Sequence, residues 1–312
     1  SFMGLGGHGL GTFAQDATPA PSVFDPAFCY TPLEGAETVQ YEAVGEGPFN
    51  IGLSNSYIGN VWRAQMIQMA QAFVQQDDIA PLISEFQVNS SGTDDAAQIA
   101  AIEDMISRGA QALVVLSNTP GGQANVLEQA RADGIVVVGF DNEIDSDEVV
   151  LVNQDQREMG RRWAEFLVEE TGGSGKILMI NGVPGTSVDT DRREGAYSVF
   201  DAQADMEYVE VVGQWDPGEA QSATATALAS NPDIAGVWCQ GGTNGAFQAF
   251  LDAGVDLVPF AGEAENGFRK QMLEYADQIN CYSIGQSPAL VCVSIRVALD
   301  LLQGKETPSY VA

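Results

Sequence analysis

Residues 112–140 read ALVVLSNTPGGQANVLEQARADGIVVVGF, and this stretch decides the fold class. The runs at 112–116 and 135–140 are almost entirely apolar, and residues 122–132 between them have the spacing of a helix with one apolar side. Continuous apolar runs, unlike alternating ones, are typical of strands buried on both faces of a parallel sheet. The stretch therefore predicts a strand–helix–strand unit of an α/β protein.

The same alternation extends in both directions from this unit. Before it, we predict strands at 50–54 and 82–88 and helices at 61–75 and 93–108. After a short strand at 149–153 a second series is predicted, in this order: helix 156–170, strand 176–181, helix 190–203, strand 207–212, helix 218–229, strand 236–239, helix 244–253, strand 257–260, helix 266–276, strand 278–284 and helix 289–302. The pattern indicates two doubly wound parallel sheets, in which functional side chains follow the carboxyl ends of the strands.

The length of 312 residues suggests two domains. Because the last predicted helix completes the apolar pattern of the first series, we expect one lobe formed by 49–154 with 287–312 and another formed by 155–286. The chain would then cross between lobes near Asn153 and Gln286, and a third time at the C-terminus. Residues 1–48 have no sustained periodicity and are interpreted as a tail or tether, with the folded part beginning at Asn50.

The charge of the chain excludes several classes of function. Asp and Glu number 43 against 13 Lys and Arg, a net charge of -30, so a nucleic acid would be repelled. The single histidine, His8, lies in a Gly-rich segment, which excludes chemistry that needs a histidine base. The GxGxxG match at 4–9 has no strand before it, so no dinucleotide cofactor is expected.

The four cysteines and the first residues leave alternatives open. Cys29, Cys239, Cys281 and Cys292 contain no CxxC pair, so no metal site is expected. They are either free buried thiols or paired in one of three ways. Residues 4–17 resemble the end of a cleaved signal peptide, which would place the protein outside the cytoplasm. A flexible tail that contains no targeting signal explains them equally well.

The turns after the predicted strands share one kind of chemistry. They contain aromatic rings, amides, carboxylates and arginines, for example at 55–63, 141–143, 240–244 and 263–266. A carbohydrate requires that set, because flat rings pack against its C–H faces while planar polar groups make paired hydrogen bonds to adjacent hydroxyls. The turns therefore favour a sugar-binding protein, and we expect no catalytic residues.

Four segments together carry a resemblance to a known family. They are SNSYIGNVWR at 54–63, GFDN at 139–142, GTSVDTDRREG at 185–195 and IGQSP at 284–288. In order and spacing they resemble the periplasmic sugar-binding proteins of the ribose, galactose and galactofuranose type, the type I solute-binding components of ABC importers. The resemblance covers about residues 50–305 and implies the type I periplasmic-binding-protein fold, two lobes joined by a hinge of several segments.

The resemblance also implies roles for particular residues. Trp62 corresponds to the aromatic residue that stacks on the sugar, and Asp141 to the carboxylate that takes two sugar hydroxyls. Arg192 corresponds to the sugar-binding arginine, and Gln286 to the glutamine where the chain crosses between lobes. The further candidate ligand-binding residues are Tyr57, Asn60, Arg63, Asn142, Asn153, Gln240 and Glu263.

The sequence departs from the family's pattern at two turns. Gln240-Gly241-Gly242 stands where many relatives have Asn-Asp, and Ala261-Gly262-Glu263 where they have Phe-Asp-Gly. The sequence therefore does not decide which residues make two of the polar contacts with the sugar, or which sugar is bound. Purely structural roles also stay open for the candidates, and Trp215 is interpreted as a core or rim aromatic.

The resemblance implies a monomeric, extracytoplasmic receptor that closes two lobes around a small neutral sugar or polyol and presents it to a membrane permease. Such a protein is not an enzyme and needs no cofactor or metal. One alternative is a sugar-sensing domain for chemotaxis or signalling, because the same closed surface would serve either partner. A carbohydrate-active enzyme is a further alternative, since paired carboxylates are its only essential groups.

Overall fold

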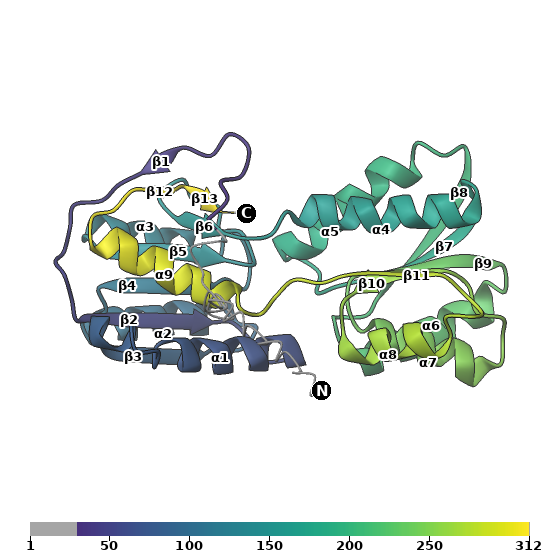
Figure 1. Cartoon of the computed structure of the whole chain (residues 1–312), viewed down its shortest axis with the longest axis horizontal. Helices are drawn as coiled ribbons and strands as arrows, with labels where there is room; N and C mark the ends of the chain where they lie inside the picture. The colour runs from purple at the N-terminus through teal and green to yellow at the C-terminus, as the bar shows by residue number, and fades with distance from the viewer. Residues whose placement is uncertain (1–29, 312) are drawn as a thin grey trace, which may run out of the picture.

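The structure, a computed structural model, describes residues 30–311 and consists of two α/β lobes joined by extended segments (Figure 1). His8, Cys29 and the signal-like segment 4–17 lie outside the described residues. Each lobe has a parallel sheet between layers of helices, which confirms the predicted fold class.

The N-terminal lobe is built on a parallel sheet with strand order β13-β6-β5-β4-β2-β3. Its strands are β2 (Phe49–Asn55), β3 (Ile83–Ser90), β4 (Ala112–Leu116), β5 (Val136–Phe140), β6 (Val150–Val152) and β13 (Tyr310–Val311). Its helices are α1 (Val61–Phe73), the 3-10 turn η2 (Ala80–Leu82), α2 (Asp95–Ser107), α3 (Ala124–Ala132) and α9 (Leu290–Leu302).

Packing on both faces of this sheet explains the apolar runs in the sequence. In β4, Val114 and Leu116 pack in one core with residues of α1 and α9. Their neighbours Leu113 and Val115 pack in a second core with residues of α2 and α3. Because adjacent strand residues point to opposite faces, a strand covered on both sides has to be apolar at every position.

The C-terminal lobe repeats the design with strand order β11-β10-β9-β7-β8. Its strands are β7 (Ser174–Asn181), β8 (Asp205–Val212), β9 (Ile234–Cys239), β10 (Phe260–Glu263) and β11 (Cys281–Ile284). Its helices are α4 (Gln156–Thr171), α5 (Ser187–Phe200), α6 (Pro217–Ser230), α7 (Thr243–Ala253) and α8 (Asn266–Glu274). The strand expected at 257–260 begins only at Phe260, and Leu257 and Val258 pack on the core from the preceding loop.

The chain passes between the lobes after β6 and again after β11 (Figure 1). Helix α9 lies on the N-terminal sheet although it follows the C-terminal one in sequence, as expected. We expected a third crossing at the C-terminus, but residues 30–311 do not contain one, so this prediction is wrong for the described residues. Tyr310 and Val311 instead pair with Leu151 and Val152 at the edge of the N-terminal sheet.

Residues 30–48 are part of the folded N-terminal lobe, so the expectation that folding begins at Asn50 is also wrong. Strand β1 (Thr38–Val39) pairs antiparallel with β12 (Thr307–Pro308). The Arg131 guanidinium lies 3.7 Å from the centre of the Tyr41 ring. These partners are distant in sequence, so residues 30–48 carry no local periodicity that would have revealed them.

Two further observations concern the described residues alone. None of their helices combines the length and the apolar character needed to cross a membrane. Cys239, Cys281 and Cys292 are free thiols, so no disulfide joins any two of them.

Candidate ligand-binding site

A cavity of about 490 Å³ lies between the two lobes, at the carboxyl ends of strands from both sheets. Its volume is within the range of small-molecule sites. Most residues predicted from the sequence line it: Asn60, Trp62, Arg63, Asp141, Arg192, Gln240, Glu263 and Gln286. Tyr57, Asn142 and Asn153 do not line it.

Arg63 forms part of the N-terminal wall and is almost completely buried. The Asn60 side chain caps helix α1 by accepting a 3.0 Å hydrogen bond from the Arg63 backbone N–H. Arg63 Nη1 donates to Asn55 Oδ1 (3.0 Å) and Ser56 Oγ (2.6 Å). The Tyr57 ring lies 4.4 Å from the guanidinium. Tyr57 therefore contacts Arg63 and supports the wall from behind.

Asp141 follows β5 and holds a carboxylate between arginines of both lobes. Its φ of 64° lies in the left-handed region, which residues other than glycine rarely adopt. The Asp141 backbone N–H donates to the Val152 carbonyl at 3.2 Å, which helps to fix this conformation. Burial raises the pKa of the Asp141 carboxyl, while the positive charges of Arg63 and Arg192 act in the opposite direction.

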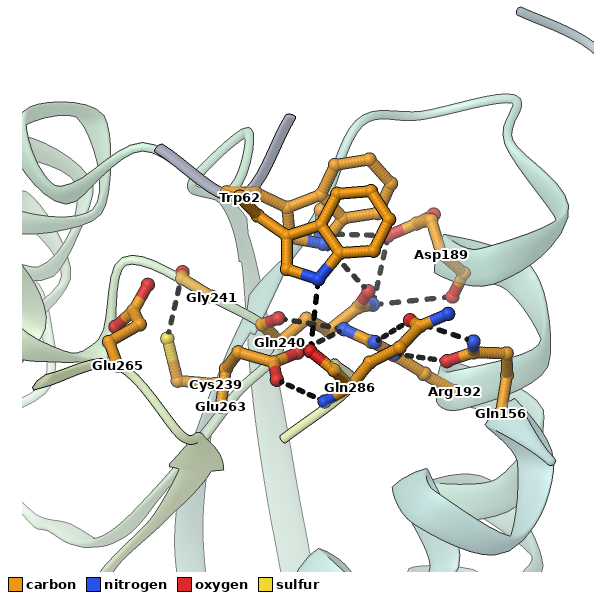
Figure 2. A network of polar contacts seen from close by, with 12 residues as sticks. Trp62, Gln156, Asp189, Arg192, Cys239, Gln240, Gly241, Glu263, Glu265 and Gln286 are labelled. Atoms are coloured by element: carbon orange, nitrogen blue, oxygen red, sulfur yellow. Dashed lines mark hydrogen bonds and ion pairs between the residues drawn. The ribbon is translucent and has the colours of Figure 1, made fainter. Parts of the chain in front are cut away.

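Arg192 is the centre of a hydrogen-bond network (Figure 2). It lies in the first turns of α5 and is 3% exposed. Its Nε donates to Gln156 Oε1 (2.8 Å), and Nη2 donates to Gln286 Oε1 (3.2 Å). Its Nη1 donates to the Gln240 carbonyl and to Glu263 Oε2, both at 2.9 Å. Four protein groups therefore fix the orientation of Arg192.

Glu263 connects this network to the second crossing between lobes. Its Oε2 pairs with Arg192, and its Oε1 accepts a 3.0 Å hydrogen bond from the Gln286 backbone N–H. Burial raises the pKa of the Glu263 carboxyl, and the Arg192 charge opposes that shift. Two protein charges thus compensate each other at this buried pair.

Trp62 lies over the same crossing (Figure 2). Its indole Nε1 donates a 2.9 Å hydrogen bond to the Gln286 carbonyl, which fixes the ring against the cavity. An indole held by its one polar atom presents its apolar faces to a ligand. This geometry agrees with the predicted stacking role.

Trp215 provides a second indole in the cavity wall, which the sequence did not single out as a ligand contact. Gln214 and Trp215 have φ of 53° and 55°, a left-handed turn that places the ring. A Cβ on Gly182 would lie 2.2 Å from the indole, and one on Gly241 would lie 2.9 Å from it. The departure of the chain from the family's pattern at Gly241 therefore makes room for Trp215.

Gln240 lines the cavity, but the protein itself satisfies its amide. Its Nε2 donates to Asp189 Oδ1 (2.9 Å), and its Oε1 accepts from Trp215 Nε1 (3.3 Å). Gln240 therefore holds Trp215 in place. In the N-terminal lobe, Asn142 Nδ2 similarly donates to the Ser117 carbonyl at 2.9 Å.

Sequence reasoning missed further cavity residues. Asn244, Glu265 and Asn266 line the C-terminal side. Glu265 Oε1 accepts from the Gly242 backbone N–H at 2.5 Å, beside the N-terminus of α7. Their turns follow strands, which was visible, but nothing in the sequence distinguishes the inward-facing side chains. Within residues 30–311, no group of three His, Cys, Asp or Glu side chains is placed to hold a metal ion.

Comparisons with known proteins agree with this geometry. The profile of the periplasmic binding protein domain family matches residues 51–306. The ribose import binding protein of Bacillus subtilis is 24% identical over 262 residues, which are 83% of this chain and 83% of that protein.

Solved structures show the same fold. A solute binding protein of an ABC transporter from Thermobispora bispora has a TM-score of 0.79 at 25% identity, over 84% of this chain and 82% of that one. The fructose binding periplasmic domain of a hybrid two-component system has a TM-score of 0.74 at 21% identity, over 84% of this chain and 87% of its own. These matches confirm the predicted fold and resemblance, and they are to binding proteins rather than enzymes.

Proposed function

Because the chain belongs to the periplasmic binding protein domain family, we propose that it captures a monosaccharide or polyol outside the cytoplasm and delivers it to the permease of an ABC importer. The protein acts as a monomeric receptor. Its lobes comprise 49–154 with 287–312, together with the packed residues 30–48, and 155–286, and the ligand is held between them.

One observation carries this proposal: a single cavity combines two indoles with buried charged groups contributed by both lobes. Trp62 and Trp215 supply apolar faces, and Asp141 and Arg192 supply planar polar groups. A pyranose or a polyol has C–H faces for the rings and hydroxyl pairs for the polar groups. The sugars in the names of the relatives, such as ribose in Bacillus subtilis, support the same class.

The charges of the cavity favour a neutral ligand. Its wall contains the carboxylates of Asp141, Glu263 and Glu265 against the guanidinium groups of Arg63 and Arg192. The chain as a whole has a net charge of -30. A sugar acid would therefore enter against an unfavourable potential.

A thermal-shift screen tests the proposal. The panel contains D-ribose, D-xylose, D-allose, D-fructose, xylitol and glycerol, with D-glucuronate as the anionic control. A ligand that binds only the folded protein at about 100 times its Kd should raise Tm by roughly 3 °C or more. We expect a neutral sugar or polyol to do so and glucuronate not to. A shift produced only by the anionic sugar would overturn the proposed ligand class.

The structural likeness to the periplasmic domain of a two-component system supports a sensing domain as the second candidate. Reconstitution with the candidate permease separates the two functions. An importer receptor should increase ATP hydrolysis by the reconstituted transporter when its sugar is present. A receptor that binds the sugar but leaves ATP hydrolysis unchanged would favour the sensing function.

A further inference from the structure

Gln156 lies where three parts of the chain meet behind the cavity, and sequence reasoning did not select it. It is the first residue of α4 and is 3% exposed. Its Nε2 donates to Asn153 Oδ1 in the first crossing (2.9 Å) and to Gln286 Oε1 in the second (3.0 Å). Its Oε1 accepts from Arg192 Nε (2.8 Å). One amide thus connects both crossings to the arginine of the cavity, and Figure 2 shows its contacts with Gln286 and Arg192.

The orientation of this amide is unambiguous. Arg192 Nε can only donate, so it must face the Gln156 oxygen. The Gln286 oxygen also accepts from Arg192 Nη2 and the Asn153 oxygen from the Gln154 backbone N–H, so both partners are acceptors and must face the Gln156 nitrogen. A flipped amide would oppose donor to donor and acceptor to acceptor, so the network has one arrangement.

Gln156 is fixed to the C-terminal lobe together with Arg192. A Cβ on Gly160, one turn along α4, would lie 1.9 Å from the Arg192 carbonyl oxygen. A Cβ on Gly195 of α5 would lie 2.0 Å from the Arg157 carbonyl oxygen. The two helices therefore approach each other through glycines and are packed backbone to backbone. Because this packing holds Gln156 beside Arg192, we expect a movement between the lobes to change the contacts of Gln156 with the crossings before those with Arg192.

We propose that Gln156 is a positioning residue that ties the orientation of Arg192 to the geometry of both crossings and so couples ligand binding to lobe movement. Gln286 gives this coupling two routes, because its Oε1 also accepts from Arg192 Nη2. Only the link to the ligand rests on the proposed function, since the link between Arg192 and the crossings is made by protein side chains alone.

Two variants distinguish the hydrogen bond that the Gln156 amide accepts from the two that it donates. Gln156→Met keeps the volume and removes all three hydrogen bonds. Gln156→Glu keeps an acceptor for Arg192 Nε and removes both donated bonds to the crossings. The matched control is Gln98→Met, because Gln98 is buried and also donates twice, to Ser54 and Leu116, and accepts once, from Asn118, far from the crossings.

The first readouts need no ligand. Hydrogen exchange of the Arg192 Nε–H is measured by NMR, and deuterium uptake is measured for peptides covering 152–156 and 284–288. We expect the Nε–H exchange to accelerate about tenfold or more in Gln156→Met and to stay slow in Gln156→Glu. Deuterium uptake at both crossings should rise in both variants and stay unchanged in Gln98→Met. Unchanged exchange and uptake in both Gln156 variants would overturn the proposal, and so would an equal acceleration of the Arg192 Nε–H exchange in Gln156→Met and Gln156→Glu.

The link to ligand is measured with D-ribose, or with whichever member of the panel raises Tm most. We expect Kd to rise about tenfold in Gln156→Met and to recover at least in part in Gln156→Glu. Equal Kd in all proteins would refute the coupling while leaving the proposed function intact. Failure of the unmodified protein to bind any panel member would instead count against the proposed function and leave the ligand-free result standing.

Discussion

Asp141 and Glu263 are the residues on which the chemistry of the cavity depends. Each is a buried carboxylate beside an arginine, and for each the cost of burial and the attraction to the arginine act in opposite directions on the pKa. Unlike Glu263, which pairs directly with Arg192, Asp141 has no ion pair within 4.0 Å in the described residues, and the Gln286 side chain is its one hydrogen-bond partner among the causes that act on its pKa. Its carboxylate is therefore the group best suited to accept hydrogen bonds from a ligand.

Replacing Asp141 with Asn should weaken sugar binding about tenfold or more, because the amide removes the charge and replaces one of the two acceptor oxygens of the carboxylate with a donor. Asp145→Asn removes an exposed acid from the same loop and should leave Kd unchanged. Isothermal titration calorimetry measures both. An unchanged Kd in Asp141→Asn would remove Asp141 from the site.

Sugar binding should weaken as the pH falls. The pKa of Asp141 is raised above 3.8 by burial, so the free protein takes up a proton there at a higher pH than an ordinary aspartate. Binding to the ionised form must release that proton, so Kd rises as the pH falls through the raised pKa. Calorimetry between pH 7 and 4 should show this rise. A Kd that stays constant over the range, in protein that remains folded, would contradict the assignment.

Among single residues, those beside recognisable motifs could be predicted from the sequence. Trp62, Asp141, Arg192 and Gln286 all line the cavity. Trp215 could not be predicted, because its place depends on the absence of side chains at Gly182 and Gly241, which are distant in sequence. Gln156 was missed because a buried amide is defined only by its partners.

At the scale of elements, the pair α4 and α5 positions Arg192 (Figure 1). Both helices begin with capped first turns, through the Asp155 and Thr186 side chains. Their close approach requires Gly160 and Gly195, where any side chain would meet backbone of the other helix. The position of the arginine is thus set by two residues that never touch the cavity.

Gly160→Ala should destabilise the protein by about 1–3 kcal/mol, because the helices must separate to admit the methyl group. It should also weaken sugar binding, since a shift of α5 would move Arg192 away from its hydrogen-bond partner Gln286. The control is Gly121→Ala, where a Cβ would meet nothing within 4 Å. Denaturant unfolding and calorimetry measure the two effects. Wild-type stability in Gly160→Ala would show that the contact is not required.

Most helices and strands could be predicted, because doubly buried strands and amphipathic helices have local patterns. Strand β4 was predicted at its observed bounds. The two-residue strands β1, β12 and β13 could not be predicted, because each exists only through pairing with a distant segment. Short strands have too few residues to show a period.

At the scale of the whole molecule, the net charge of -30 should make stability depend on salt. Self-repulsion destabilises a compact, highly charged chain, and it is screened as the Debye length falls from about 10 Å at 0.1 M to about 3 Å at 1 M. Tm should therefore rise between 0.1 and about 1 M KCl. An uncharged cosolute at equal osmolality is the control. A Tm that falls or stays constant in KCl would contradict this expectation.

The central claim, that the two lobes close around an unmodified sugar, belongs to the same scale. Asp141 lies on one side of the cavity and Trp215 on the other, so a ligand contacting both is bound most tightly when the lobes approach. Ligand then shifts the population toward closure by its differential affinity for the closed form.

Small-angle X-ray scattering with and without the sugar identified by the thermal-shift screen, followed by chemical recovery of that sugar, tests the claim most directly. The account predicts a smaller radius of gyration in the presence of the sugar and recovery of the sugar unchanged after prolonged incubation. Tight binding with an unchanged radius of gyration, or conversion of the sugar to a product, would contradict it.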